Sequence, residues 1–175
     1  MSSSVVPVYA QGFFIMSRLG RVTQIVVFDY YDPEKYYLSL LRRGSLEEEL
    51  SRIEENMQYF LDEERVYING VRTYPKVIST TLSFRGDVTR PYITFIIEFS
   101  GPIRAGLNKY EDYYEEEVVE YDYEFTWFFP EGWRVRGAEL AVPYEIIEDR
   151  VLVARVKKGT KVGPYEAILF EVGEK

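Results

Sequence analysis

The chain contains no cysteine and no histidine among its 175 residues. Disulfide bonds, thiolate catalysis, imidazole general-base catalysis and the usual zinc and haem sites are therefore excluded within it, because each needs one of these side chains. Catalysis would have to use paired carboxyl groups, a Lys or Ser nucleophile, or a metal ion held by oxygen atoms. The G-x-S-x-G, S-x-x-K, Walker A and G-x-G-x-x-G motifs are also absent. These absences favour a protein that is not an enzyme and carries no cofactor.

Long apolar runs and basic clusters are missing as well. The longest apolar stretches, "FFIM" and "IVVF", are far shorter than the ~18 residues that a membrane-spanning helix needs. The first residues, "MSSSVVPVYAQ", lack a basic segment followed by an apolar one, so we expect no secretory signal and a cytoplasmic location. The formal net charge of −8 disfavours binding to nucleic acid or to an anionic membrane. We therefore expect neither as a partner.

Side-chain amides are scarce. The chain has Asn only at Asn56, Asn69 and Asn108, and Gln only at Gln11, Gln24 and Gln58. Few amides, no cysteine, and abundant Glu and Tyr are typical of thermophilic proteins, because these residues survive heat and support ion-pair networks. We interpret the composition as that of a thermophile, with chance bias in a short chain as the alternative.

Apolar periodicity divides the chain into an early helical part and a later strand-rich part. Asp32 and Pro33 are typical of a helix start, and the "SLEE" segment at Ser45 has the pattern of a capping box. After residue 65 the apolar period changes to two, and Asn69-Gly70 between β-rich flanks predicts a tight hairpin. The predicted elements are strands at 5–16 and 21–29, helices at 33–43 and 45–62, and antiparallel strands from residue 65 onward.

This order of elements predicts an α+β fold. We expect a single antiparallel sheet, flat or strongly curved, covered on one face by the early helix pair, because such a sheet keeps one face dry and one wet. The length is close to that of one ordinary domain, and we find no internal repeat and no linker. The prediction is one domain over 1–175, with 137–143 as the alternative boundary.

Residues 118–133, "VVEYDYEFTWFFPEGW", combine acids and aromatic rings in alternation. One face of a strand here would carry Val119, Tyr121, Tyr123, Phe125, Trp127 and Phe129, and the other would carry Glu120, Asp122, Glu124 and Thr126. Burying the ring face would contribute on the order of 10–18 kcal/mol before conformational entropy is subtracted. A register slip of one residue would bury carboxylates instead. We therefore expect the ring side to be dry and the carboxylate side to be hydrated.

The two tyrosines of the ring face suggest a ligand pocket. Their hydroxyl groups need partners if they are buried, so the tyrosine end of the strand is amphipathic while the phenylalanine end is apolar. This gradient predicts the mouth and floor of a pocket between the sheet and the helix pair, or else a strand that emerges into water at its tyrosine end. The candidate pocket residues are Tyr121, Tyr123, Phe125, Trp127, Met57 and Phe60.

An apolar residue on the outer side of the same strand suggests an interface. Phe128 falls opposite Trp127 and Phe129, where the chain after residue 133 or another subunit would have to cover it. We take Phe128 and Trp133 as the candidate interface residues.

Eight acids lie between residues 109 and 124. The favoured interpretation is a solvated face paired with Lys and Arg of neighbouring strands. The alternatives are a Ca²⁺ or Mg²⁺ site, for which Glu120, Asp122 and Glu124 are weak candidates, and a surface that docks on a basic partner. No EF-hand spacing is present, and carboxylates two apart on a strand rarely converge on one ion, so we predict no metal site.

Two functions remain open from the residues alone. The first is a non-enzymatic interaction or assembly protein that self-associates into a homo-oligomer through apolar patches. A different protein is the alternative partner for these patches. The alternative function is a carrier of an apolar or aromatic small molecule, held between the helix pair and the sheet.

Overall fold

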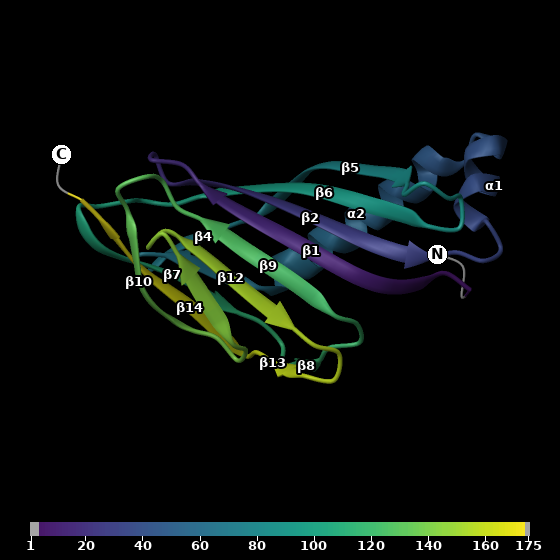
Figure 1. The fold of residues 1–175 in the computed structure, drawn as a ribbon. Helices are drawn as coiled ribbons and strands as arrows, with labels where there is room; N and C mark the ends of the chain where they lie inside the picture. Colours follow the sequence, from purple (N-terminus) through teal and green to yellow (C-terminus); the bar gives the residue numbers. More distant parts are fainter. Residues whose placement is uncertain (1–3, 174–175) are drawn as a thin grey trace.

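Two facing sheets and a pair of helices make up residues 4–173, the part of the chain that the computed structural model describes (Figure 1). The larger sheet has seven strands, in the spatial order β11 (Tyr144–Ile147), β12 (Val151–Val156), β9 (Tyr123–Phe128), β1 (Val6–Met16), β2 (Arg21–Tyr31), β6 (Pro91–Ser100) and β5 (Lys76–Phe84). Its neighbouring strands run antiparallel except β1 and β9, which are parallel and pair Ala10 with Tyr123 through Ile15 with Phe128. The sheet therefore joins the N-terminal hairpin to a strand more than a hundred residues later.

The second sheet has five antiparallel strands. Their spatial order is β10 (Arg134–Glu139), β14 (Tyr165–Val172), β7 (Gly106–Tyr113), β3 (Arg65–Ile68) and β4 (Val71–Thr73). The predicted hairpin is confirmed: Asn69 (φ 51°) and Gly70 (φ 76°) connect β3 and β4, and both take the positive φ that a two-residue turn of this kind requires. A separate pair, β8 (Glu117–Val118) and β13 (Lys161–Val162), lies beside this sheet.

The first helix begins later than predicted. α1 spans Tyr36–Arg43 rather than 33–43, because the chain first makes a turn in which Lys35 takes the left-handed conformation (φ 56°). The N-cap residue is therefore Lys35, and the predicted N-cap at Asp32 with Pro33 as the first helical residue is wrong. The buried Asp32 carboxylate still accepts hydrogen bonds from the backbone N–H groups of Tyr36 and Tyr37, at 3.0 Å each.

The second helix agrees with its predicted bounds to within one residue at each end. α2 spans Leu46–Glu63, but the predicted capping box does not form, because Ser45 makes no side-chain capping bond. Glu48 instead binds Arg52 one turn later, at 2.6 Å. The helix packs on β5, at one end of the seven-stranded sheet.

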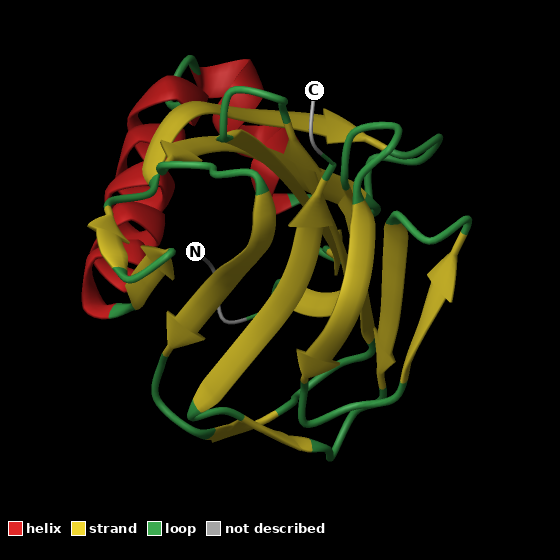
Figure 2. Ribbon diagram, turned by 90° about the vertical axis from the view of Figure 1, so that its left-hand side faces the viewer, coloured by secondary structure: helices red, strands yellow, loops and turns green. Residues whose placement is uncertain are grey.

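Both hydrophobic cores of the protein pack against the same face of the large sheet. On β6, Ile93, Phe95 and Ile97 pack with residues of the two helices, whereas Phe99, next on the same face, belongs to the core between the two sheets. Figure 2 shows the result: the sheets curve toward each other as in a partly open barrel, and the helices lie at one side. The helices therefore cover one part of that face, and the five-stranded sheet covers another part.

The predicted single sheet covered by a helix pair is wrong. The fold is α+β, but the strands form three sheets, and the helices cover only part of one of them. Alternation shows which side chains of a strand share a face, but it does not show which strands pair. The interior that we assigned to the helices is mostly filled by the five-stranded sheet.

The alternation in 118–133 is largely as expected. Val119, Phe125, Trp127 and Phe129 are buried, Tyr121 and Tyr123 are partly buried, and Glu120 and Asp122 are exposed. The regular strand is shorter than the pattern and covers only Tyr123–Phe128. Two residues of the expected hydrated face differ from the prediction: Glu124 is half-buried, and Thr126 is 5 % exposed, because β9 is a central strand and Phe13 and Val153 flank Thr126 on either side.

Residues 137–143, the alternative domain boundary, lie where the chain passes from one sheet to the other. β10 ends at Glu139 in the five-stranded sheet, and β11 begins at Tyr144 in the seven-stranded one. The single-domain assignment stays a prediction. Neither helix in residues 4–173 is long and apolar enough to cross a membrane.

Candidate functional site

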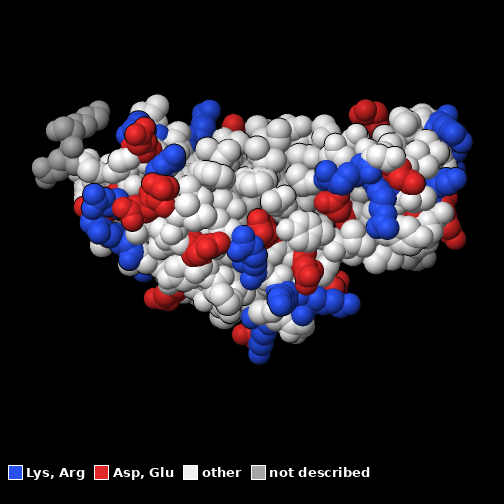
Figure 3. Space-filling model, in the orientation of Figure 1, with Lys and Arg blue, Asp and Glu red and all other residues white. Residues whose placement is uncertain are grey.

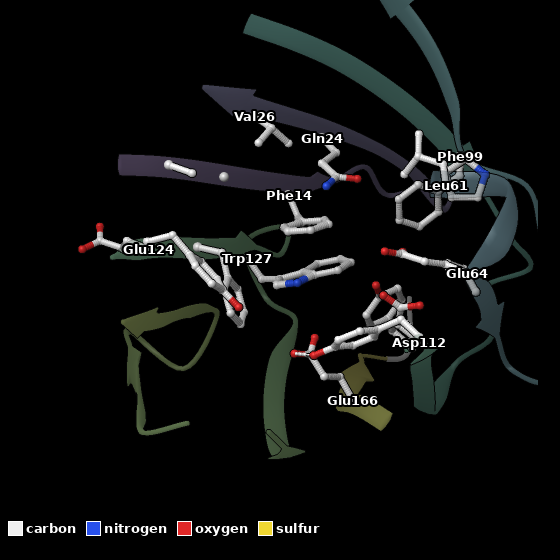
Figure 4. Close-up of a pocket in the computed structure, with 18 of the residues that line it drawn as sticks. Phe14, Gln24, Val26, Leu61, Glu64, Phe99, Asp112, Glu124, Trp127 and Glu166 are labelled. Carbon is white, nitrogen blue, oxygen red and sulfur yellow. Dashed lines mark hydrogen bonds between the residues drawn. The ribbon is translucent and has the colours of Figure 1, made fainter. Parts of the chain in front are cut away.

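A cavity of about 310 Å³ lies where the two sheets and the end of α2 meet (Figure 4). Strands β1, β2, β6 and β9 provide one wall, β3, β7 and β14 provide the opposite wall, and Leu61 and Glu64 close one side. Gly12 on β1 lies at this wall without a side chain, which leaves room there. The cavity thus forms at the one place where the cover of the large sheet changes from helix to sheet.

Trp127 dominates the aromatic side of the cavity. Its ring is 2 % exposed and stacks on Phe14, with ring centroids 4.5 Å apart and planes 6° from parallel. Tyr110 of the opposite sheet approaches Trp127 to the same centroid distance, 4.5 Å, at a tilt of 52°. These contacts fix the indole ring between the sheets, as Figure 4 shows for its stacking on Phe14.

Strand register brings three acids to the opposite wall. In the five-stranded sheet, Asp112 of β7 pairs directly with Glu166 of β14 on one side and with Val66 of β3 on the other. Glu64 precedes Val66 by two residues and so falls on the same face. All three carboxyl groups line the cavity, and in Figure 4 they point toward the space beside the Trp127 ring.

Burial keeps protons on these acids. It raises the pKa of Asp112 to about 9, with the neighbouring Glu64 and Glu166 charges adding to the effect. Burial also raises the pKa of Glu64 to about 7 and raises that of Glu166, although a hydrogen bond from Tyr114 opposes the rise at Glu166. Like charges directly opposite on one face of a sheet repel, and low polarity strengthens the repulsion. The group therefore holds at least one proton near neutral pH.

The hydrogen bonds of the acids are incomplete. Glu64 and Asp112 are close enough for each to shift the pKa of the other, and the Tyr114 hydroxyl donates to Glu166 Oε1 at 2.6 Å. Asp112 Oδ1 is buried, yet it has no hydrogen-bond partner in the described part of the chain, and the residue as a whole is 8 % exposed. A buried carboxyl oxygen without a partner costs free energy. A ligand that donates a hydrogen bond there would remove this cost.

Positive charge is missing from the cavity. No Lys or Arg lies among its lining residues within 4–173, and none of the ion pairs found there includes Glu64, Asp112 or Glu166. Glu117 and Glu124 add two more acids to the lining. The site therefore suits a ligand that brings hydrogen-bond donors or positive charge.

The predicted pocket residues divide into two groups. Tyr121, Tyr123, Phe125 and Trp127 line the cavity. Met57 and Phe60 do not: Met57 packs in the separate core beneath the helices, and Phe60 is 61 % exposed on α2. The helical spacing placed both on the inner stripe of α2, but only the last turn of that helix reaches the cavity.

The two predicted interface residues lie in different environments. Trp133 is 4 % exposed and stacks against Phe170 between the sheets, with centroids 5.8 Å apart, so the chain itself covers it. Phe128 is half-buried on the outer face of the large sheet, where its neighbour is the Phe13 ring at 6.3 Å. Only Phe128 remains available at the surface.

Of the three acids considered for a metal ion, Glu124 lines the cavity, and Glu120 and Asp122 are not among its lining residues. Glu124 pairs with Arg155 at 3.0 Å, the Asp122 carboxylate accepts the Lys158 backbone N–H at 2.8 Å, and Glu120 is exposed. Over residues 4–173, no group of three or more acids has an arrangement that could hold a metal ion.

Glu64, Asp112 and Glu166 were not singled out from the sequence, although two of them carry a signal. Asp112 continues the inward face of Asn108 and Tyr110, and Glu166 precedes the inward residues Ile168 and Phe170 by the same period of two. Acids in phase with a buried face indicate a functional or protonated group. Glu64 gives no such signal, because it follows directly on a helix.

No family model and no curated protein matches this chain. Among solved structures it is similar to a crystal structure from Parabacteroides distasonis described as a "putative protease", with 7 % sequence identity and a TM-score of 0.31. The match covers 98 % of this chain and 41 % of that one, so this chain spans less than half of that protein's length. A likeness of this degree carries no conclusion about activity.

Proposed function

We propose that the protein binds a small molecule in the cavity between its two sheets and acts as a carrier rather than an enzyme. The observation that supports this most is the unpartnered Asp112 Oδ1 at the wall of an aromatic-lined cavity. Protein interiors are packed densely, and buried polar atoms without partners are rare. An open space and an unsatisfied acid at the same place favour a ligand-binding site over imperfect packing.

Filling the cavity from Gly12 should abolish ligand binding without unfolding the protein. A Cβ atom at this position would meet Phe125 Cβ at 3.7 Å and Phe14 at 4.0 Å, which are ordinary contacts. We expect binding to weaken progressively in the series Gly12→Ala, Gly12→Val and Gly12→Leu. The melting temperature should hold or rise, because a strand glycine is replaced and apolar volume fills a void.

Binding can be followed by Trp127 fluorescence in a Trp133→Phe background, with indole and benzyl alcohol as neutral probes. Native mass spectrometry of the purified protein would detect a retained ligand as added mass in the wild type and not in Gly12→Leu. Equal binding by wild type and Gly12→Leu would place the ligand elsewhere. Absence of binding by both, with every probe, would refute the carrier function.

A second candidate function, self-association, is favoured by the outer face of the large sheet. In Figure 3, which views this face, a wide uncharged area lies over β1 and β2 with charged side chains toward its margins. Phe13 and Phe128 are only half-buried there, and Ile15 is 43 % exposed. Apolar patches of this kind mark interaction surfaces. A second copy of the chain fits best, because an uncharged centre lets two acidic molecules approach without repulsion.

We expect light scattering at micromolar concentration to give a dimer or larger species, and the Phe128→Glu and Ile15→Glu variants to be monomers. These two residues are paired across β1 and β9, so each substitution places a charge at the same spot. Leu19→Glu is the matched control, because Leu19 is 92 % exposed in a turn and should not alter the mass. A wild-type monomer that persists at high concentration would exclude this function.

A further inference from the structure

We propose that the ligand of the cavity is a small organic ammonium ion with an apolar body. The inference rests on the proposed carrier function and specifies its ligand class. The ammonium group would lie against Glu64, Asp112 and Glu166, and the apolar body against the aromatic wall around Trp127.

The charge of the site supports a cationic ligand. One buried carboxyl group, that of Asp112, and two half-buried ones, those of Glu64 and Glu166, face one space, and the lining contributed by residues 4–173 includes no Lys or Arg. The C-terminal end of α2 adds to the negative potential, because Leu61 and Glu64 lie at the cavity and the last turn of this helix has no basic residue. An anionic ligand would be repelled by every charged group in the lining.

The geometry of Asp112 supports a ligand with N–H groups. Its Oδ1 atom is buried and lacks a partner, and it is a strong acceptor once the acid loses its proton. Glu166 Oε1 already accepts the Tyr114 hydroxyl, which holds that carboxyl group in place. An ammonium group with several N–H donors can satisfy Asp112 and a neighbouring acid together, which a quaternary ammonium ion cannot do.

The rest of the lining limits the size and character of the ligand. Phe14, Tyr110, Phe125 and Trp127 present ring surfaces that suit an apolar body and attract an adjacent cation. A volume of about 310 Å³ is at the lower end of the range for ligand sites, so the ligand is small. A bare metal ion is disfavoured, because no three acids among the described residues converge on one point.

Binding of the cation should displace protons. The site holds protons on its acids, and an ammonium ion competes with them for the same oxygen atoms. Titratable groups face the site from every element that lines it: Glu64 after α2, Tyr110 and Asp112 of β7 with Tyr114 just after it, Glu117 of β8, Tyr123 and Glu124 of β9 with Tyr121 just before it, and Glu166 of β14. Binding should therefore tighten as the pH rises from 5 to 8.

The test compares benzylamine with benzyl alcohol, which has nearly the same shape but no charge, by isothermal titration calorimetry at pH 8. We expect benzylamine to bind wild-type protein about tenfold or more tightly than benzyl alcohol, because a charge-assisted hydrogen bond is gained. Titrations in two buffers of different ionisation enthalpy should show proton release for benzylamine and none for benzyl alcohol. Benzyltrimethylammonium, which has no N–H group, should bind more weakly than benzylamine.

The variants Asp112→Asn and Glu64→Gln should remove the preference for benzylamine and keep the binding of benzyl alcohol. Glu120→Gln is the control, because it makes the same change in charge at an exposed position. Equal affinity of wild type for the two probes would overturn the cation inference and leave the carrier function standing. Failure of benzylamine to bind the wild type would also overturn the cation inference. If a variant does not fold, the measurement of proton release on the wild type still tests the inference.

Discussion

Raising the pH from 5 to 9 is expected to destabilise the unliganded protein by several kcal/mol. Burial raises the pKa of Asp112, Glu64 and Glu166 in the folded state, so they keep protons that the unfolded chain releases near pH 4. The stabilisation is fully present below the unfolded pKa and is lost as the pH rises toward about 7 for Glu64 and about 9 for Asp112. Each such proton contributes a slope of about 1.4 kcal/mol per pH unit. Over the range from pH 5 to 9, stability should therefore be highest at pH 5 and should fall as the pH rises.

Chemical denaturation at intervals between pH 5 and 9 measures this slope. The Asp112→Asn variant should lose less stability over the range and should be more stable than the wild type at pH 9, because it cannot ionise. Exposed Glu120→Gln should follow the wild type, since nothing encloses its carboxyl group. Asp87 and Glu171 have pKa values lowered by hydrogen bonds, so they titrate below this window. A flat profile for the wild type would mean that the three acids are hydrated.

Replacing Trp127 by alanine should cost about 3–5 kcal/mol of the free energy of unfolding. The ring is 2 % exposed and touches both sheets, through Phe14 on one side and Tyr110 on the other. Stacked aromatic pairs add to the loss of buried area. Because whole domains are stable by only about 5–15 kcal/mol, the variant should be close to unfolding at room temperature.

The matched control is Phe60→Ala, which also removes an aromatic ring. Phe60 is 61 % exposed on α2, so this variant should stay within about 0.5 kcal/mol of the wild type. It should also bind every probe as the wild type does, because Phe60 does not line the cavity. A Trp127→Ala protein as stable as Phe60→Ala would contradict the packing of the two sheets described above.

The local structure was largely readable from the sequence because its causes are local. The Asn69-Gly70 turn, the amphipathic helix α2 and the buried ring face of β9 all follow from side chains a few residues apart. The capping box at Ser45 does not form, although Glu48 pairs with Arg52 one turn later as expected. The thermophilic source inferred from composition stays a prediction.

The candidate site was only half visible in the sequence. Part of its aromatic wall was predicted because four rings alternate in one segment, 121–127, but Phe14 and Tyr110 were not, and the pocket was expected between the helix pair and the sheet. Its acids come from three segments, at Glu64, Asp112 and Glu166, and they meet only because β14 pairs with β7 and β7 with β3. The acids that stood out in the sequence, Asp122 and Glu124, are bonded to the Lys158 backbone N–H and to Arg155 instead.

The sequence by itself determined which chemistry is impossible and which face of each strand is dry, because side-chain types and a period of two suffice for both. Only the tertiary structure decided what covers the dry face of the large sheet, since pairing between distant strands depends on contacts that no local pattern encodes. The dry face is covered by a second sheet as well as by the helices. This arrangement forms the cavity and places three acids against Trp127.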